Sequence, residues 1–162
     1  MIVLELPDKK IINVELPSTG KKIAGDILPN RLKDIIAIKV CNEVWDLSRE
    51  INTPSNISFI FRGDEEALEI IRHDAAHVMA EAVQELYPNT QVTIGPVIEN
   101  GFYYDFAREK PFSSEELDVI EKKMHEIVSR DEVINREIWK REDGLNFFND
   151  KGEHFKSELI SS

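Results

Sequence analysis

The sequence predicts an α+β protein with two domains, and three observations lead to this prediction. Short β-branched runs alternate with turn residues through the first part of the chain. Helical periodicity begins abruptly after Gly63. Further on, the pair Asn100-Gly101 is a strong hairpin signal. We therefore expect one domain over residues 1–63 and a second over residues 64–162.

The first domain is expected to begin with a hairpin followed by a helix. Two β-branched runs, residues 2–6 and 11–16, flank a proline-containing turn. A short helix over residues 19–27, capped by Ser18 or Thr19, should follow. Three more strands are expected, over residues 35–40, 43–46 and 57–61. Two strands, a helix and three further strands in this order predict a small β-grasp domain.

A long helix is expected to open the second domain. From Glu65 to Leu86 apolar residues recur at helical spacing, and Asp64 is suited to the N-cap. The hairpin at Asn100-Gly101 comes next. The remaining elements are expected in this order: a helix over residues 114–130 behind a serine cap, a strand over 133–139, a helix over 142–149 and a strand over 154–160.

Composition narrows the classes of protein. Lys and Arg number 20 against 31 Asp and Glu, and a net charge of -11 disfavours broad electrostatic binding to nucleic-acid phosphates. The single cysteine, Cys41, cannot form an internal disulfide. The chain also has neither a signal-peptide pattern nor an apolar run of about 18 residues. We therefore expect a soluble, cytoplasmic protein without membrane contact.

His73 and His77 are the first candidates for chemistry. Four residues apart on a helix, their side chains point the same way, with Cβ atoms about 5–6 Å apart. Imidazole is both a metal ligand and a proton carrier near neutral pH. A zincin would need glutamate at the position of Asp74, so the sequence disfavours that class. The other His and Cys residues are Cys41, His125 and His154. They lie in separate elements without the spacing of metal ligands, so no metal is expected. The spacing alone also fits two exposed helix histidines without a function.

Three segments in order carry a family resemblance: EIIRHDAAH at residues 69–77, IGPVIENGFYYD at 94–105 and GEHFK at 152–156. Together they resemble the amino-terminal part of bacterial-type threonyl-tRNA synthetases. Residues 1–63 are similar to the TGS domain of that family, a ubiquitin-like β-grasp. Residues 64–162 are similar to the first part of its editing domain, which alanyl-tRNA editing proteins share. The family commonly has a Ser-Cys-Ala-like stretch where this chain has Asp74-Ala75-Ala76, and both imidazoles are kept.

The resemblance implies a hydrolytic editing site. Serine lacks one methyl of threonine, a difference worth only about 1–3 kcal/mol in selection, so a second pocket is needed to hydrolyse seryl-tRNA(Thr). The parent enzyme attaches threonine to tRNA(Thr) with ATP. The resemblance assigns catalytic roles to His73, His77 and Lys156, and substrate-binding roles to Tyr104, Gly95 and Pro96.

The resemblance also implies limits. The family's Cys-x-x-x-His element and its class II core, with ATP, magnesium, zinc and the homodimer interface, are expected beyond Ser162. The isolated chain should therefore need no cofactor, should not aminoacylate, and should edit weakly or not at all. Contact with the acceptor end of tRNA(Thr) is expected in the full-length parent. Two alternatives stay open, a TGS-containing regulatory or ligand-binding module without catalysis and a metal-dependent hydrolase.

Overall fold

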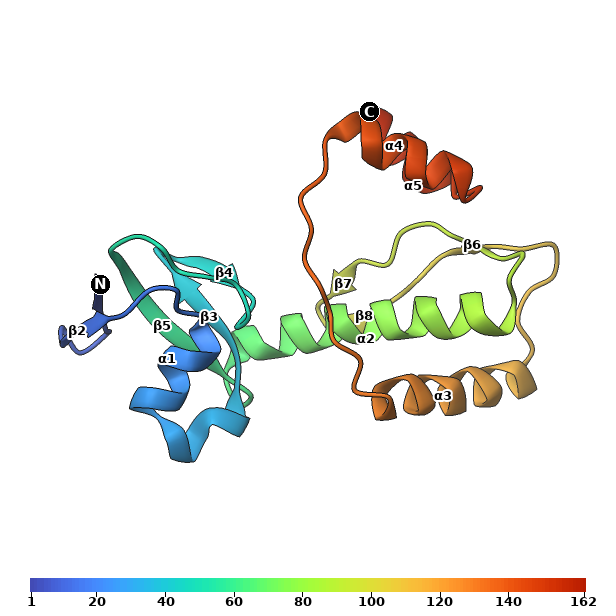
Figure 1. The fold of residues 1–162 in the computed structure, drawn as a ribbon. Coiled ribbons are helices and arrows are strands. Elements are labelled where there is room, and N and C mark those ends of the chain that lie inside the picture. Colours follow the sequence, from blue (N-terminus) through green and yellow to red (C-terminus); the bar gives the residue numbers. More distant parts are fainter. The chain divides into compact units, whose positions relative to one another are not determined.

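The structure is a computed structural model that describes residues 1–162. The chain divides into two compact units, Met1–Ile70 and Ile71–Ser162 (Figure 1). Helices and strands occur in both units, as the predicted α+β class requires. None of the helices combines the length and the apolar character needed to cross a membrane.

A mixed five-stranded sheet with the strand order β2-β1-β5-β3-β4 forms most of unit 1. Only β1 and β5 pair in parallel, and all other neighbours are antiparallel. The predicted hairpin and the three later strands are confirmed. Their bounds are β1 Ile2–Glu5, β2 Ile11–Val14, β3 Ile35–Val40, β4 Glu43–Trp45 and β5 Ser55–Phe61.

Helix α1, Gly20–Ile27, packs on this sheet. The Thr19 hydroxyl accepts a hydrogen bond from the Lys22 backbone N–H at 3.2 Å, which confirms the predicted cap. A 3₁₀ helix, η1 Pro29–Asp34, follows. A Cβ on Gly20 would lie 2.9 Å from Ile38 Cγ2, so glycine permits the close approach of α1 to β3. The buried core consists of Ile2, Leu4, Val14, Ile23, Ile38, Val40, Ile51 and Ile57.

Helix α2, Glu65–Leu86, begins in unit 1 and continues into unit 2. Its first turns pack through Ala67 against Ala37 and Ile60 of the sheet. Asp64 directly precedes α2, at the predicted N-cap position. The Asp64 carboxylate accepts a hydrogen bond from the Phe61 N–H at 2.8 Å, which closes the turn before the helix instead of satisfying a helical N–H.

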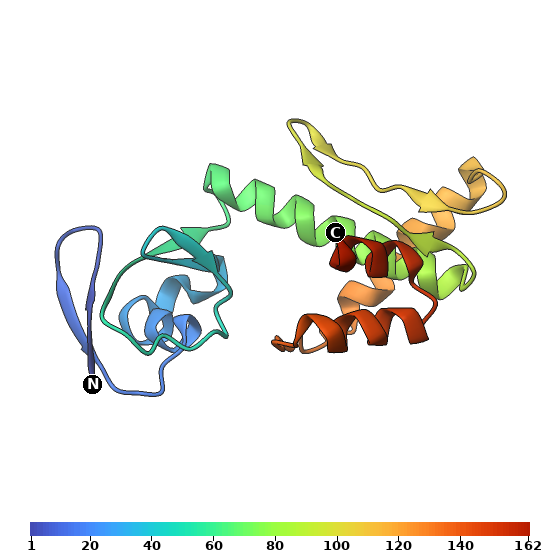
Figure 2. The ribbon, with the colours of Figure 1, turned by 90° about the horizontal axis from the view of Figure 1, so that it is seen from above.

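Unit 2 holds two short antiparallel ladders and helix α3, Ser114–Ser129, which packs against α2 (Figure 1 and Figure 2). Ser113 caps α3, which confirms the predicted serine cap, and it forms a capping box with Glu116. The buried core contains Ala82, Val83, Ile120 and Ile127. The ladders pair β6 Gln91–Val92 with β9 Phe106–Ala107, and β7 Val97–Ile98 with β8 Gly101–Phe102.

The hairpin between β7 and β8 is confirmed, but its centre differs from the prediction. Ile98 pairs with Gly101, so the two loop residues are Glu99 and Asn100. Gly101 is the first residue of β8 and has a φ of 155°. Its positive φ suits a residue without Cβ, so the glycine is needed beside the turn.

Two predicted strands of unit 2 are wrong. Residues 133–139 pair with no neighbour, and Ile134 is 91% exposed. A β-branched run becomes a strand only where another strand supplies hydrogen bonds. The other error concerns residues 154–160, which form helix α5, His154–Ser161. Its more buried residues are Lys156, Ser157 and Ile160. Helix α5 pairs with helix α4, Arg141–Asp150, drawn with it in red in Figure 2.

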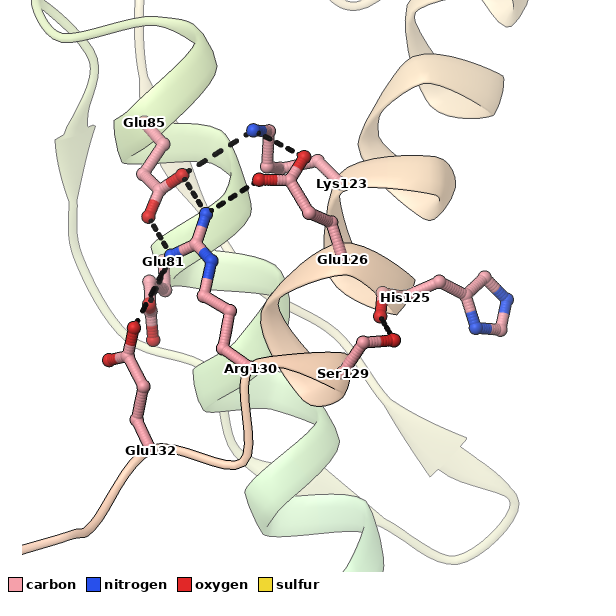
Figure 3. A network of polar contacts seen from close by, with 8 residues as sticks. All are labelled: Glu81, Glu85, Lys123, His125, Glu126, Ser129, Arg130 and Glu132. Carbon is pink, nitrogen blue, oxygen red and sulfur yellow. Dashed lines mark hydrogen bonds and ion pairs between the residues drawn. The ribbon is translucent and has the colours of Figure 1, made fainter.

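A charged network joins α2 to the end of α3 (Figure 3). The Arg130 guanidinium donates to both carboxylate oxygens of Glu85, at 2.6 and 2.7 Å, and to Glu126 at 2.9 Å. Lys123 forms ion pairs with Glu85 at 3.5 Å and with Glu126 at 2.8 Å. The hydrogen bonds from Arg130 hold the pKa of Glu85 at about 2, well below the ordinary value for glutamate.

Arg130→Ala is expected to destabilise unit 2 at neutral pH more than in acid. Because the folded pKa of Glu85 lies below its unfolded value, the stabilisation is present above about pH 4.5 and is lost as the pH falls toward 2. Urea midpoints of wild type and variant, measured by circular dichroism at neutral pH and near pH 3, should therefore converge in acid. The control is Arg136→Ala, since Arg136 is exposed. An equal difference in urea midpoint between wild type and Arg130→Ala at both pH values would contradict a stabilising role of the Arg130–Glu85 ion pair.

Candidate functional site

The two predicted histidines lie one turn apart on α2 and contact each other. The distance between His73 Nε2 and His77 Nε2 is 3.0 Å, and the rings meet edge to face with centroids 4.6 Å apart. One nitrogen donates and the other accepts in such a contact, so the two rings cannot both be imidazolium there. Burial and then the neighbouring His73 lower the pKa of His77, and Lys156 adds to this while Asp74 opposes it. A neutral imidazole is thus favoured at His77.

Lys156 projects from α5 and is half-buried. Its positive charge is the smallest of the causes that change the pKa of His77, and it lowers that pKa. Lys156 Nζ lies 3.8 Å from Glu153 Oε2 and 5.4 Å from the centre of the Phe148 ring. Although the predicted strand is a helix, the charge of the lysine still acts on His77.

Tyr104 and Gly95 form a second contact in unit 2. A Cβ on Gly95 would lie 2.1 Å from Tyr104 Cδ2, so the ring lies directly on the glycine backbone. Tyr104 also stacks on Phe106, with ring centroids 5.0 Å apart. Burial, and then the charge of Glu153, raise the pKa of Tyr104, which keeps its hydroxyl protonated as a donor. Pro96 is exposed, and its carbonyl accepts a hydrogen bond from the Tyr103 N–H at 3.4 Å.

Backbone contacts hold the Gly95 segment and the hairpin in place. The Asp105 N–H donates to the Ile94 carbonyl at 3.0 Å, immediately beside Gly95. Arg72, the residue before His73 on α2, donates a hydrogen bond from Nη1 to the Glu99 carbonyl at 2.8 Å. The β7–β8 hairpin is therefore tied to the turn of α2 that carries the histidine pair.

Glu153 interacts with both Lys156 and Tyr104. The sequence alone does not identify it as a site residue. It forms the ion pair with Lys156 and also raises the pKa of Tyr104. The one signal in the sequence is its position three residues before Lys156 in the GEHFK segment. Residues three apart lie on the same face of a helix, so the two side chains are neighbours at the start of α5.

The chain has no group of three His, Cys, Asp or Glu side chains that could hold a metal ion. Cys41 lies in unit 1, exposed at the turn between β3 and β4 with a φ of 51°. The chemical groups gathered in unit 2 are two imidazoles, an ammonium, a phenol and a carboxylate. These groups suit proton transfer and the stabilisation of an oxyanion.

Comparison with known proteins gives the family. No family model matches the chain. It is 54% identical over 160 residues to a threonine--tRNA ligase of Granulibacter bethesdensis, 52% over 161 residues to one of Rhodospirillum rubrum and 49% over 162 residues to one of Parvibaculum lavamentivorans. Each alignment covers at least 99% of this chain and 25% of the relative.

A sequence identity of about 50% over almost the whole chain places it among the aminoacyl-tRNA synthetases. It belongs by sequence to the threonyl-tRNA synthetase family, where it corresponds to the amino-terminal region. The chain spans about a quarter of the length of the curated relatives it matches.

Proposed function

We propose that this chain serves a threonine--tRNA ligase as its hydrolytic editing region, with residues 64–162 removing serine from mischarged seryl-tRNA(Thr). The observation that carries the proposal is the contact of His73 and His77 at 3.0 Å, with the charge of Lys156 acting on His77. Family membership supplies the substrate class. The parent joins threonine to tRNA(Thr) with ATP in the cytoplasm as a homodimer, and its magnesium and zinc belong to the rest of the enzyme.

Residues 1–63 are proposed to be the TGS-like β-grasp domain of the same enzyme. β1 and β5 are the first and last strands of this unit along the chain, and they pair in parallel at the middle of the sheet. This pairing supports the assignment. Helix α1 follows the first hairpin and packs on the sheet, as a β-grasp requires. The strand order and the position of the helix are arguments about fold, so they carry no function for this domain.

The proposed reaction is the attack of water on the seryl ester. A neutral imidazole of the pair accepts a proton from water as the oxygen bonds to the carbonyl carbon. The Lys156 ammonium stabilises the negative charge that develops on the carbonyl oxygen. The bond from carbon to the ribose oxygen then breaks, that oxygen takes the proton back from the imidazolium, and serine and tRNA(Thr) leave. Tyr104, with the backbone of Gly95 and Pro96, shapes the pocket against the extra methyl of threonine.

The test is deacylation of seryl-tRNA(Thr) by a chimera in which this chain replaces the corresponding region of the Granulibacter bethesdensis relative. His73→Ala and His77→Ala are each expected to lower the deacylation rate about 100-fold, since they remove a proton carrier. The wild-type rate should hold to a pH below about 6.5 and fall in acid, because the pKa of His77 is lowered. The isolated chain should be much slower than the chimera.

The control variant is His125→Ala, an exposed histidine on α3. It should leave deacylation unchanged, and threonylation should be unchanged in every variant. Full deacylation by both site variants would favour the regulatory or ligand-binding module instead. Stoichiometric zinc in the purified chain, lost in His73→Ala, would favour the metal-dependent hydrolase.

A further inference from the structure

The carboxylate of Glu153 is largely removed from water, and capping of its own helix does not explain this burial. It stands at the N-cap of α5, yet its side chain makes no capping hydrogen bond. Its side chain is 18% exposed. The carboxylate reaches α2 instead, where Oε1 accepts a hydrogen bond from Gln84 Nε2 at 2.6 Å. A charge in such a place is costly unless its partners compensate it.

A second glutamine fixes the same short segment. Gln91 Nε2, on β6, donates to the Gly152 carbonyl at 2.7 Å. Gly152 has a φ of 72°, a conformation that glycine adopts readily. Side chains from α2 and β6 thus hold residues 152 and 153, so the first turn of α5 has a defined place in unit 2.

The second oxygen of Glu153 faces the cation of the site. Glu153 Oε2 is buried without a hydrogen-bond partner, and Lys156 Nζ lies 3.8 Å away. That distance gives attraction without a hydrogen bond, which leaves the lysine donors free for another acceptor. Lysine is a flexible side chain with considerable rotamer entropy, so a defined position for its ammonium needs a fixed counter-charge.

We propose that Glu153 is a positioning residue whose carboxylate, fixed by Gln84, holds the Lys156 ammonium beside the histidine pair. The inference deepens the proposed function and rests on it for its catalytic meaning. The arrangement itself concerns three side chains of one unit, Gln84, Glu153 and Lys156. Without the carboxylate, the lysine is expected to turn into solvent and leave His77.

The test is a histidine NMR titration of the purified 162-residue chain, which contains only four histidines. The groups that act on His77 are His73, Asp74 and Lys156. Lys156→Met should raise the pKa of His77, because a neighbouring positive charge is removed. Glu153→Gln should raise it by a comparable amount if the lysine moves away, and the double variant should add nothing to Lys156→Met.

Glu153→Gln is suited to this purpose because its amide oxygen can still accept from Gln84, so only the charge is lost. Gln84→Ala is a second variant that should raise the pKa of His77 in the same direction. The matched control is Glu158→Gln, an exposed glutamate on the same helix, which should change nothing. An unchanged or lowered pKa of His77 in Glu153→Gln, or additive effects in the double variant, would overturn the proposal.

Deacylation by the chimera supplies an independent second readout. Glu153→Gln is expected to lower the maximal rate about as much as Lys156→Met. The titration decides the positioning role even if the chimera fails to hydrolyse seryl-tRNA(Thr). Conversely, a rate loss in the His73 and His77 variants would uphold the editing site even if Glu153 proved irrelevant. The two proposals can therefore fail separately.

Discussion

Gly95→Ala is expected to displace the Tyr104 ring and to reduce editing by the chimera about 100-fold, the loss that a misplacement of about 1 Å can cause. The added Cβ would lie 2.1 Å from Tyr104 Cδ2 and 2.8 Å from Cγ, close to the root of the ring. A rotation of the ring alone cannot relieve a clash at Cγ. Phe106 stacks on the ring, and the hydrogen bond from Asp105 to Ile94 fixes the backbone.

The measurement combines deacylation of seryl-tRNA(Thr) with the urea midpoint of the isolated chain. Overpacking of this kind costs about 1–3 kcal/mol of folding free energy. Gly144→Ala is the control, because its nearest neighbour, Ile160 Cδ1, is 4.0 Å away and it lies inside helix α4. The control should edit normally. Wild-type deacylation and stability in Gly95→Ala would show that Tyr104 does not depend on this glycine.

Ile38→Ala is expected to remove most of the folding free energy of unit 1. Ile38 is fully buried on β3, where its side chain contacts Gly20 of α1. Truncation of a buried isoleucine costs about 2–5 kcal/mol, because a cavity is left behind. A domain of about 70 residues rarely has more than about 3–5 kcal/mol in total. The variant should therefore be largely unfolded in unit 1 at moderate temperature.

Tryptophan fluorescence can follow this unit alone. Trp45 packs against the core of unit 1, while Trp139 lies in unit 2, so a Trp139→Phe background leaves one reporter. The matched control is Ile134→Ala, the same truncation at a side chain that is 91% exposed. It should leave the unfolding midpoint unchanged. A similar midpoint for both truncations would mean that Ile38 is not part of a close-packed core.

The elements that could be predicted from sequence are those with local causes. The Ser113 capping box and the Thr19 cap depend on hydrogen bonds within three residues. The run at residues 133–139 has the composition of a strand but no pairing partner, and pairing is a property of two segments. The segment at 154–160 is too short for its period to distinguish strand from helix.

The candidate site was predictable to a different degree for each residue. His73 and His77 share a helix, so their proximity follows from the period of 3.6 residues alone. Lys156 and Tyr104 follow only from the family resemblance, because no local pattern connects them with the histidines. Glu153 was missed because its hydrogen-bond partner Gln84 is 69 residues away in the sequence. Contacts of that range are visible only in the folded chain.

The extended segment between α3 and α4 acts as a tether for the helix pair that carries Lys156. Residues 131–140 are all exposed and connect the helix pair that carries Lys156 to the rest of unit 2. A short tether keeps its two ends at an effective concentration on the order of millimolar. Docking of α5 through the Gln84 and Gln91 hydrogen bonds therefore needs only a modest intrinsic affinity. The contact of α5 with α2 and β6 is therefore intramolecular, and a ligand that contacts both α2 and α5 would stabilise it further.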